Sequence, residues 1–111
     1  MGTIKTITHL EESKKLAGFL KGSDYTWFKD KKLGYVASQC PYDLLEDDDK
    51  EENYPCWTLP ALLDLIPEVG LFAPSISKYW ECHSNNIVGN GETPIDACVD
   101  LIIKLHKEDM L

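Results

Sequence analysis

The sequence predicts an α+β fold: one small domain, residues 1–111, in which three helices pack on an antiparallel sheet of three to four strands. Helix-like and strand-like segments follow the order α-β-β-α-β-β-α along the chain. The length of 111 residues suits a single domain with one modest core. Apolar residues make up 43% of the chain and charged residues 27%, a composition typical of folded globular proteins.

The N-terminal third predicts a helix followed by a β-hairpin. Thr8 and Glu11 have the spacing of a capping box, in which two side chains satisfy free backbone N–H groups where a helix begins. Gly22 is the residue type that commonly follows the last helical turn. Segments 24–29 and 33–38 are rich in aromatic and β-branched residues and flank a short charged turn, so we expect two antiparallel strands.

Residues 39–53 predict a long acidic loop, because they contain no sustained apolar period. The formal net charge of the chain is −8. Seven acidic residues and Lys50 give this segment a net charge of −6: Asp43, Glu46, Asp47, Asp48, Asp49, Glu51 and Glu52. The alternating spacing and central glycine of an EF-hand are absent, so a solvated loop is favoured over a calcium site.

The middle of the chain predicts a buried helix. Thr58 can cap its start, leucines cover most of its circumference, and Pro67 ends it. The segment from Glu68 to Ser75 is expected to be a connection without regular structure.

The C-terminal third predicts a second hairpin and a long helix. Segments 78–83 and 87–88 read as strands around the turn-like sequence SNN. Thr93, Pro94 and Asp96 combine an N-cap, a first-position proline and an acid in the first turn, which is the strongest helix start in the sequence. Further along this helix, Asp100 and Lys104 are spaced to pair.

Two segments carry a family resemblance. The sequences YPCWTLPALLDLIP (54–67) and TPIDACVDLIIKLH (93–106) resemble a family of small proteins from phages and mobile elements of Bacteroides-group gut bacteria, and EESKKLAGFL (11–20) is similar to that family's usual start. The resemblance implies a small α+β domain of phage or mobile-element origin. It implies no activity and no site residue, and the aspartate-rich loop lies outside the shared pattern.

Charge and composition argue against several classes of function. A sequence pI near 4.7 without a basic patch disfavours nucleic-acid binding, which requires a basic footprint. No segment approaches the roughly 18 to 20 apolar residues of a membrane span, and no signal peptide is evident, so we expect no membrane association and a cytoplasmic location. In that compartment the four cysteines should be reduced thiols.

Metal and cofactor sites are not predicted. The residue types that bind zinc are present, at Cys40, Cys56, Cys82, His83, Cys98 and His106. No C-x-x-C or H-x-x-x-H pair exists, so each ligand would have to come from a separate element. Phosphate-binding glycine motifs and hydrolase motifs are also missing, which lowers the expectation of an enzyme and of a cofactor.

The leading hypothesis is a non-enzymatic module that binds another protein. Asp47, Asp48 and Asp49 would form a charged rim beside the aromatic anchors Tyr54 and Trp57, a combination typical of protein interfaces.

Two alternatives stay open. In the first, a small enzyme or ligand-binding domain has a pocket near Trp80, Glu81 and His83, where Glu81 and His83 lie on the same side of a strand and could exchange a proton. In the second, the chain forms a homodimer through leftover apolar surface such as Ile103 on the last helix.

Overall fold

The protein belongs to the predicted α+β class. The computed structural model describes residues 6–74 and 78–110, which contain four α-helices, one short 3-10 helix and six strands. The strands form two three-stranded antiparallel sheets instead of the single sheet that we expected. Each predicted hairpin gains a third strand, β3 (Tyr54–Cys56) or β4 (Gly70–Phe72). These strands have only three residues each, too few to produce a periodic signal in the sequence.

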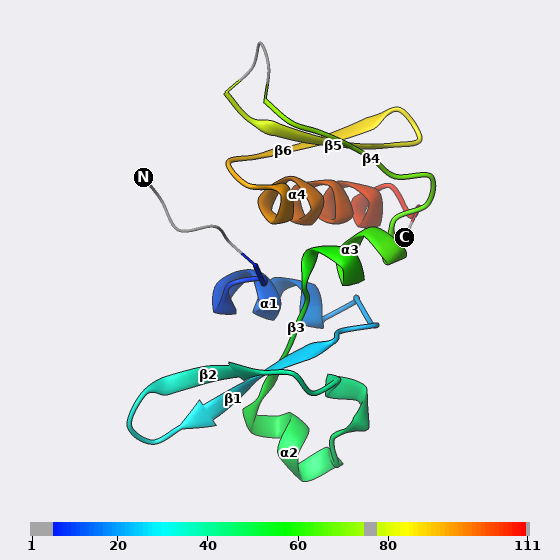
Figure 1. Ribbon diagram of the computed structural model, residues 1–111. Helices are drawn as coiled ribbons and strands as arrows, with labels where there is room; N and C mark the ends of the chain where they lie inside the picture. Colours follow the sequence, from blue (N-terminus) through cyan, green and yellow to red (C-terminus); the bar gives the residue numbers. More distant parts are fainter. Residues whose placement is uncertain (1–5, 75–77, 111) are drawn as a thin grey trace. The chain divides into compact units, whose positions relative to one another are not determined.

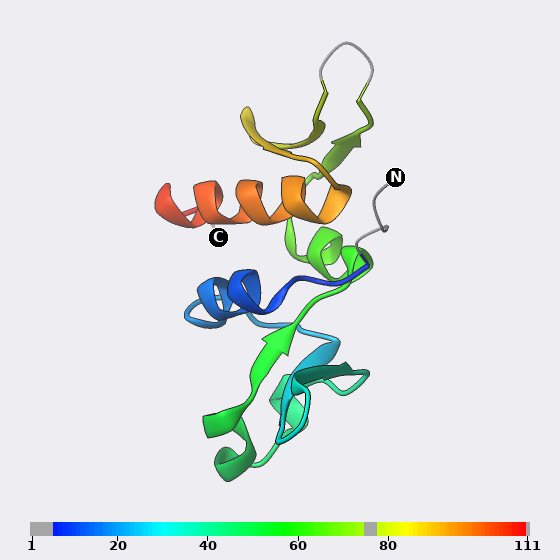
Figure 2. The ribbon, with the colours of Figure 1, turned by 90° about the vertical axis from the view of Figure 1, so that its left-hand side faces the viewer.

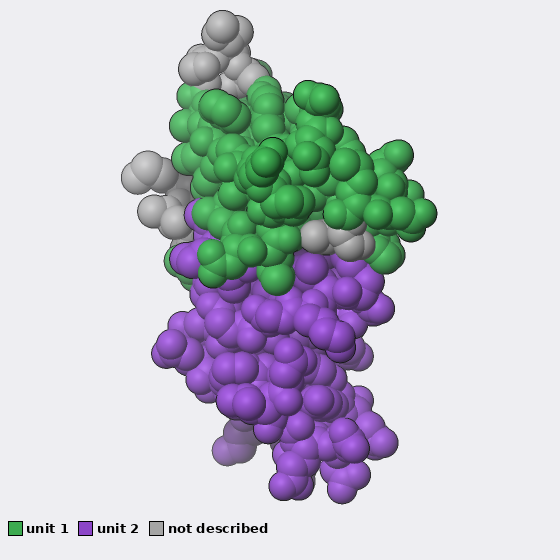
Figure 3. Space-filling model, turned by 90° about the vertical axis from the view of Figure 1, so that its right-hand side faces the viewer, with its two compact units in different colours: residues 1–6, 62–111 green, residues 7–61 purple. Residues whose placement is uncertain are grey.

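The chain divides into two compact units, which are coloured separately in Figure 3. Unit 1 comprises residues 1–6 and 62–111, and unit 2 comprises residues 7–61. Each unit contains one of the two sheets. The division falls within α3 (Leu59–Leu65), the leucine-rich helix, where the backbone N–H of Ala61 donates to the Thr58 hydroxyl at 3.5 Å.

Unit 2 contains the predicted hairpin, in which β1 lies at the centre of a sheet with strand order β2-β1-β3 (Figure 1). Phe28 lies opposite Val36 in the antiparallel register. At the turn, the Asp30 carboxylate accepts hydrogen bonds from two backbone N–H groups, and Gly34 has a positive φ of 83°. The elements of this unit, in chain order, are α1 (Leu10–Ala17), β1 (Tyr25–Asp30), β2 (Gly34–Ser38), η1 (Tyr42–Leu44), α2 (Asp47–Glu52) and β3.

The first helix differs from the prediction at both ends. Its N-cap is His9, whose backbone N–H donates to the Glu12 carboxylate at 2.9 Å, and not Thr8. Thr8 is fully buried, and its hydroxyl contacts the Ser13 hydroxyl at 2.8 Å and accepts from the Trp57 backbone N–H at 3.1 Å. The Thr8 hydroxyl therefore forms its hydrogen bonds within the core of unit 2. The helix also ends at Ala17, before the predicted stop at Gly22.

The acidic stretch also differs from the expected irregular loop, because it contains η1 and the helix α2. Three aspartates occupy the first turn of α2 and Lys50 lies in its last turn. This order matches the helix macrodipole, which favours negative charge at the N-terminal end and positive charge at the C-terminal end. A search for apolar periodicity alone misses such a helix, since none of its residues is buried.

Unit 1 is a three-strand meander covered on one face by a long helix (Figure 2). Asn85 and Asn86 both have positive φ, 50° and 66°, as a two-residue type I′ hairpin turn requires. The Thr93 hydroxyl accepts from the Asp96 backbone N–H at 3.1 Å, which confirms the predicted helix start. The strands and helix of this sheet, in chain order, are β4, β5 (Trp80–Ser84), β6 (Ile87–Gly91) and α4 (Pro94–Lys107).

Strand β4 lies in the stretch that we expected to be an irregular connection; the last residue of that stretch, Ser75, lies outside the described residues. Helix α4 supplies most of the core of unit 1, through Ile95, Ala97, Cys98, Val99, Leu101, Ile102 and Leu105. None of the helices in the described residues has the length and apolar character needed to cross a membrane.

Candidate functional site

The carboxylates of α2 form an exposed acidic face on unit 2. We define the acidic face as Asp47, Asp48, Asp49, Glu51 and Glu52, all of which are exposed. For the part of the chain that the structure describes, no ion pair links any of them to a lysine or histidine. The negative charge of this face is therefore exposed to solvent and is not neutralised by an ion pair within the unit.

Side chains from the surrounding elements hold the C-terminal end of α2. The last carbonyls of a helix lack partners within the helix. Here the Asn53 amide donates to the Asp49 carbonyl at 2.6 Å, and the Tyr42 hydroxyl donates to the Lys50 carbonyl at 2.8 Å. A second hydroxyl, that of Tyr35, donates to the Glu52 carbonyl at 3.5 Å. The helix is thus tied both to the preceding 3-10 turn and to strand β2.

Asn53 also connects α2 to the central strand, because its side-chain oxygen accepts from the Lys29 backbone N–H at 2.9 Å. The Lys50 ammonium lies 5.7 Å from the centre of the Tyr42 ring, within the range of a cation–π contact. Burial raises the pKa of Tyr42 above its ordinary value, and the nearby Asp43 carboxylate raises it further. The Tyr42 hydroxyl therefore stays protonated, as its hydrogen bond to α2 requires.

The structure separates the two aromatic residues that we expected beside the acidic residues. Tyr54 is half-buried, with its ring 5.9 Å from the ring of Tyr35 and 5.3 Å from the Lys14 ammonium. Trp57 is 0% exposed, and its indole N–H donates to the Lys21 carbonyl at 3.1 Å. The prediction of Trp57 as an interface anchor was wrong, because its whole side chain belongs to the core of unit 2.

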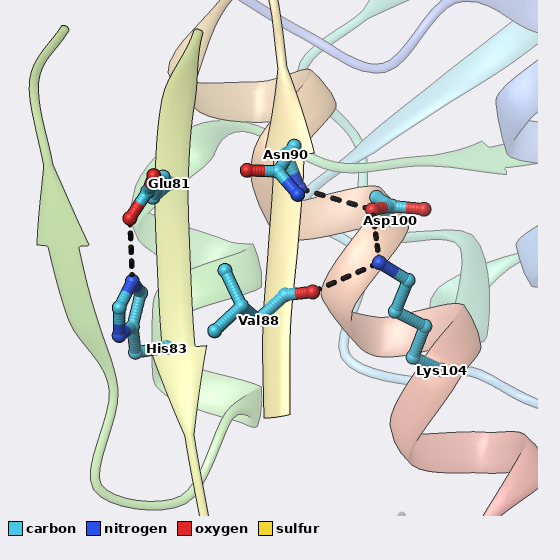
Figure 4. Close-up of polar contacts among 6 residues, drawn as sticks. All are labelled: Glu81, His83, Val88, Asn90, Asp100 and Lys104. Atoms are coloured by element: carbon cyan, nitrogen blue, oxygen red, sulfur yellow. Dashed lines mark hydrogen bonds and ion pairs between the residues drawn. The ribbon is translucent and has the colours of Figure 1, made fainter. Parts of the chain in front are cut away.

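A second candidate surface is the helix-free face of the unit 1 sheet. Glu81 and His83 lie on this face of β5, and the imidazole Nε2 is 2.9 Å from the Glu81 carboxylate (Figure 4). The ring of Phe72, an exposed residue on β4, lies 4.7 Å from the His83 ring. The structure therefore brings together the predicted carboxylate and imidazole and adds an aromatic neighbour from β4.

Trp80 does not join this pair. Successive residues of a strand point to opposite faces, so Trp80 shares its face with Cys82 and not with Glu81. An open hollow of about 250 Å³ lies beside His83, lined also by Glu68, Gly70, Phe72, Asn85 and Asn86. Ser84 also lines this hollow, but its side chain is buried and its hydroxyl donates to the Pro67 carbonyl and not to His83.

The outer edge of β6 is closed by two side chains of α4. Lys104 and Asp100 form the predicted i, i+4 ion pair at 3.0 Å. The Lys104 ammonium donates to the Val88 carbonyl at 2.9 Å, and the Asp100 carboxylate accepts from the Asn90 backbone N–H at 3.0 Å (Figure 4). Unpaired strand edges invite pairing with another chain, and these contacts occupy that edge.

The described residues form no evident metal site and no evident dimer interface. Across residues 6–74 and 78–110, no group of three or more His, Cys, Asp or Glu side chains could hold a metal ion. His106 is exposed at the end of α4, and Ile103 is partly exposed, so the Ile103 homodimer stays a prediction.

No family model, no curated protein and no solved structure matches this chain. The resemblance to phage and mobile-element proteins therefore stays a prediction from the sequence.

Proposed function

We propose that this protein is a non-enzymatic interaction module whose acidic face binds a positively charged surface of another protein. The observation that carries the proposal is the fixation of α2: three side-chain hydrogen bonds hold its C-terminal carbonyls while its five carboxylates point into solvent. A fixed arrangement of charge loses less conformational entropy on binding than a flexible loop does. We place this interaction in the cytoplasm, in a chain of phage or mobile-element origin, on the sequence grounds given above.

Tyr54 is the aromatic residue that remains available to such an interface. It directly follows α2 and Asn53 in the chain, and its ring is only partly buried. Protein interfaces commonly combine a charged rim with partly buried aromatic anchors. We therefore keep Asp47, Asp48, Asp49 and Tyr54 as the partner-binding residues and remove Trp57.

Ligand binding or catalysis at Glu81 and His83 is the second candidate. It is supported by their 2.9 Å contact and by the adjacent hollow of about 250 Å³. It ranks lower because the hollow is open and small compared with the roughly 300 to 1,000 Å³ of typical ligand pockets. The described residues also place no free nucleophile beside the imidazole.

Charge substitution tests the proposal. The variant Asp47→Asn/Asp48→Asn/Asp49→Asn removes three charges from the acidic face, and Asp47→Glu/Asp48→Glu/Asp49→Glu keeps them. A control with three neutralised carboxylates on unit 1, Glu68→Gln/Glu92→Gln/Glu108→Gln, has the same net charge as the first variant. Partners are recovered from a Bacteroides-group lysate on the immobilised chain and quantified by mass spectrometry at low and high salt.

We expect the asparagine variant to lose recovery of a basic partner by about tenfold, since each exposed charge contributes about 0.5 kcal/mol. The glutamate variant and the unit 1 control should retain the partner, and high salt should weaken all the complexes. Equal recovery by the asparagine variant and the control would contradict the proposal.

A further inference from the structure

Two cysteines meet inside unit 1. Cys82 lies on β5 and Cys98 on α4, and both side chains are fully buried. Their sulfur atoms are 3.5 Å apart, with the Cys98 thiol donating to the Cys82 sulfur. The other two cysteines have no sulfur neighbour among the described residues: Cys40 is partly exposed, and Cys56 is hydrogen-bonded to Thr8.

Close packing of helix on sheet brings the two sulfurs together. Cys82 lies opposite Gly89 in the β5–β6 register. A Cβ atom at Gly89 would lie 2.4 Å from the Ala97 carbonyl oxygen and 2.4 Å from the Leu101 nitrogen. The backbone of α4 therefore rests directly on β6, and this short separation lets the Cys98 sulfur reach the neighbouring strand.

We propose that Cys82 and Cys98 are a redox modification site that forms an intramolecular disulfide when the protein meets a peroxide oxidant. A disulfide has a sulfur–sulfur bond of about 2.05 Å, so the two sulfurs must approach by about 1.5 Å from their contact distance. Rotation of two short side chains and a small shift of α4 would have to supply that movement. The disulfide would tie the central strand of the sheet to the helix that covers it.

The reaction with hydrogen peroxide balances in two steps. The Cys82 thiolate attacks one peroxide oxygen, the O–O bond breaks, and a sulfenic acid and water form once the leaving hydroxide takes up a proton. The Cys98 thiolate then attacks the Cys82 sulfur, the S–O bond breaks, and hydroxide leaves and becomes water on protonation. Overall, two thiols and one peroxide give one disulfide and two water molecules.

Cys82 is the residue expected to react first. The hydrogen bond from Cys98 stabilises its thiolate and lowers the pKa of Cys82. The same contact, together with burial, raises the pKa of Cys98, which therefore keeps its proton until Cys82 has been oxidised. Because both sulfurs are buried, the peroxide reaches them when unit 1 opens locally, so oxidation should be slower than that of an exposed thiol.

Peptide mapping of the full-length chain tests this assignment. Trypsin is unsuitable, because no lysine or arginine lies between the two cysteines. Cleavage after glutamate separates them, since Glu81, Glu92 and Glu108 produce the peptides 82–92 and 93–108. The chain is incubated with hydrogen peroxide, the remaining thiols are blocked, and the digest is analysed without reductant.

We expect the intact mass to fall by about 2 Da, the mass of the two hydrogens lost when a disulfide forms. Free thiols should fall from four to two, and peptides 82–92 and 93–108 should be joined in a product that dithiothreitol reverses. Cys40→Ser should behave like the unmodified sequence, whereas Cys98→Ala should give no joined peptides. Four persistent thiols, or disulfides formed only through Cys40 or Cys56, would overturn the proposal. The mapping uses the unmodified sequence, so its result stands even if Cys98→Ala does not fold.

Discussion

Substitution of Gly89 by alanine should strongly destabilise unit 1. Beyond the two close contacts at 2.4 Å, the added Cβ would lie 2.7 Å from the Leu101 Cα. All three are backbone atoms of α4, so no side chain can rotate away to make room. Ordinary contacts begin near 3.4 Å. The helix must therefore move away from β6 by about 1 Å or more, and it would lose packing along the face that holds most of the unit 1 core.

The expected cost lies at the upper end of the range for overpacked cores, about 3 kcal/mol. For a chain of this length, such a loss corresponds to a decrease in Tm of about 13 °C. Urea unfolding followed by circular dichroism measures the free energy, and a thermal scan measures Tm. Because the chain has two units, the change should appear in the transition of unit 1 if the two transitions separate.

Gly18 provides the matched control. It has a helical φ of −69° and nothing within 4 Å of an added Cβ, so Gly18→Ala should leave stability unchanged or raise it by up to about 1 kcal/mol. A Gly89→Ala protein that unfolds within about 0.5 kcal/mol of the unmodified protein would refute the close packing of α4 on β6.

Three further predictions concern single side chains. Hydrogen bonds from backbone N–H groups of the β1–β2 turn lower the pKa of Asp30. The hairpin should therefore gain stability above the ordinary carboxyl pKa and lose it as the pH falls through the lowered pKa. An NMR titration measures the pKa of Asp30, and Asp30→Asn should abolish this pH dependence of stability. Tyr42→Phe removes the hydrogen bond to the Lys50 carbonyl and should cost about 1 kcal/mol, with faster amide exchange in α2. Asp100→Ala frees the Asn90 N–H at the edge of β6 and should cause concentration-dependent association in light scattering; a monomer at all concentrations would show that this contact does not protect the edge.

The sequence predicts those elements whose signals are local. The predicted start of α4 is confirmed, because Thr93, Pro94 and Asp96 act within one helical turn. The prediction of both hairpins is confirmed, because strand-forming segments flank short polar turns. In the second turn, Asn85 and Asn86 tolerate positive φ. The i, i+4 ion pair of α4 follows from the same local geometry.

Elements that depend on distant partners were missed. The six-residue helix α2 is held at its end by side chains that include Tyr35, which is remote in sequence, so residues 39–53 read as a loop. Trp57 looked like a surface anchor because it follows an acidic stretch, yet its indole N–H is satisfied by the Lys21 carbonyl inside the core. Alternation along β5 placed Glu81 and His83 together correctly, because that relation needs only the strand period.

The close contact at Gly89 connects the stability of unit 1 to its thiol chemistry. A helix pushed away from β6 would also carry the Cys98 sulfur away from Cys82, because β6 and β5 are paired at this position. Gly89→Ala should therefore lower the yield of the Cys82–Cys98 disulfide and the free energy of unfolding, while the more frequent opening of unit 1 should let peroxide reach Cys82 faster. The acidic face lies on unit 2 and is held by contacts within that unit, so the same substitution should leave partner binding unchanged. Loss of both the disulfide and partner binding in Gly89→Ala would mean that the two units do not behave independently in solution.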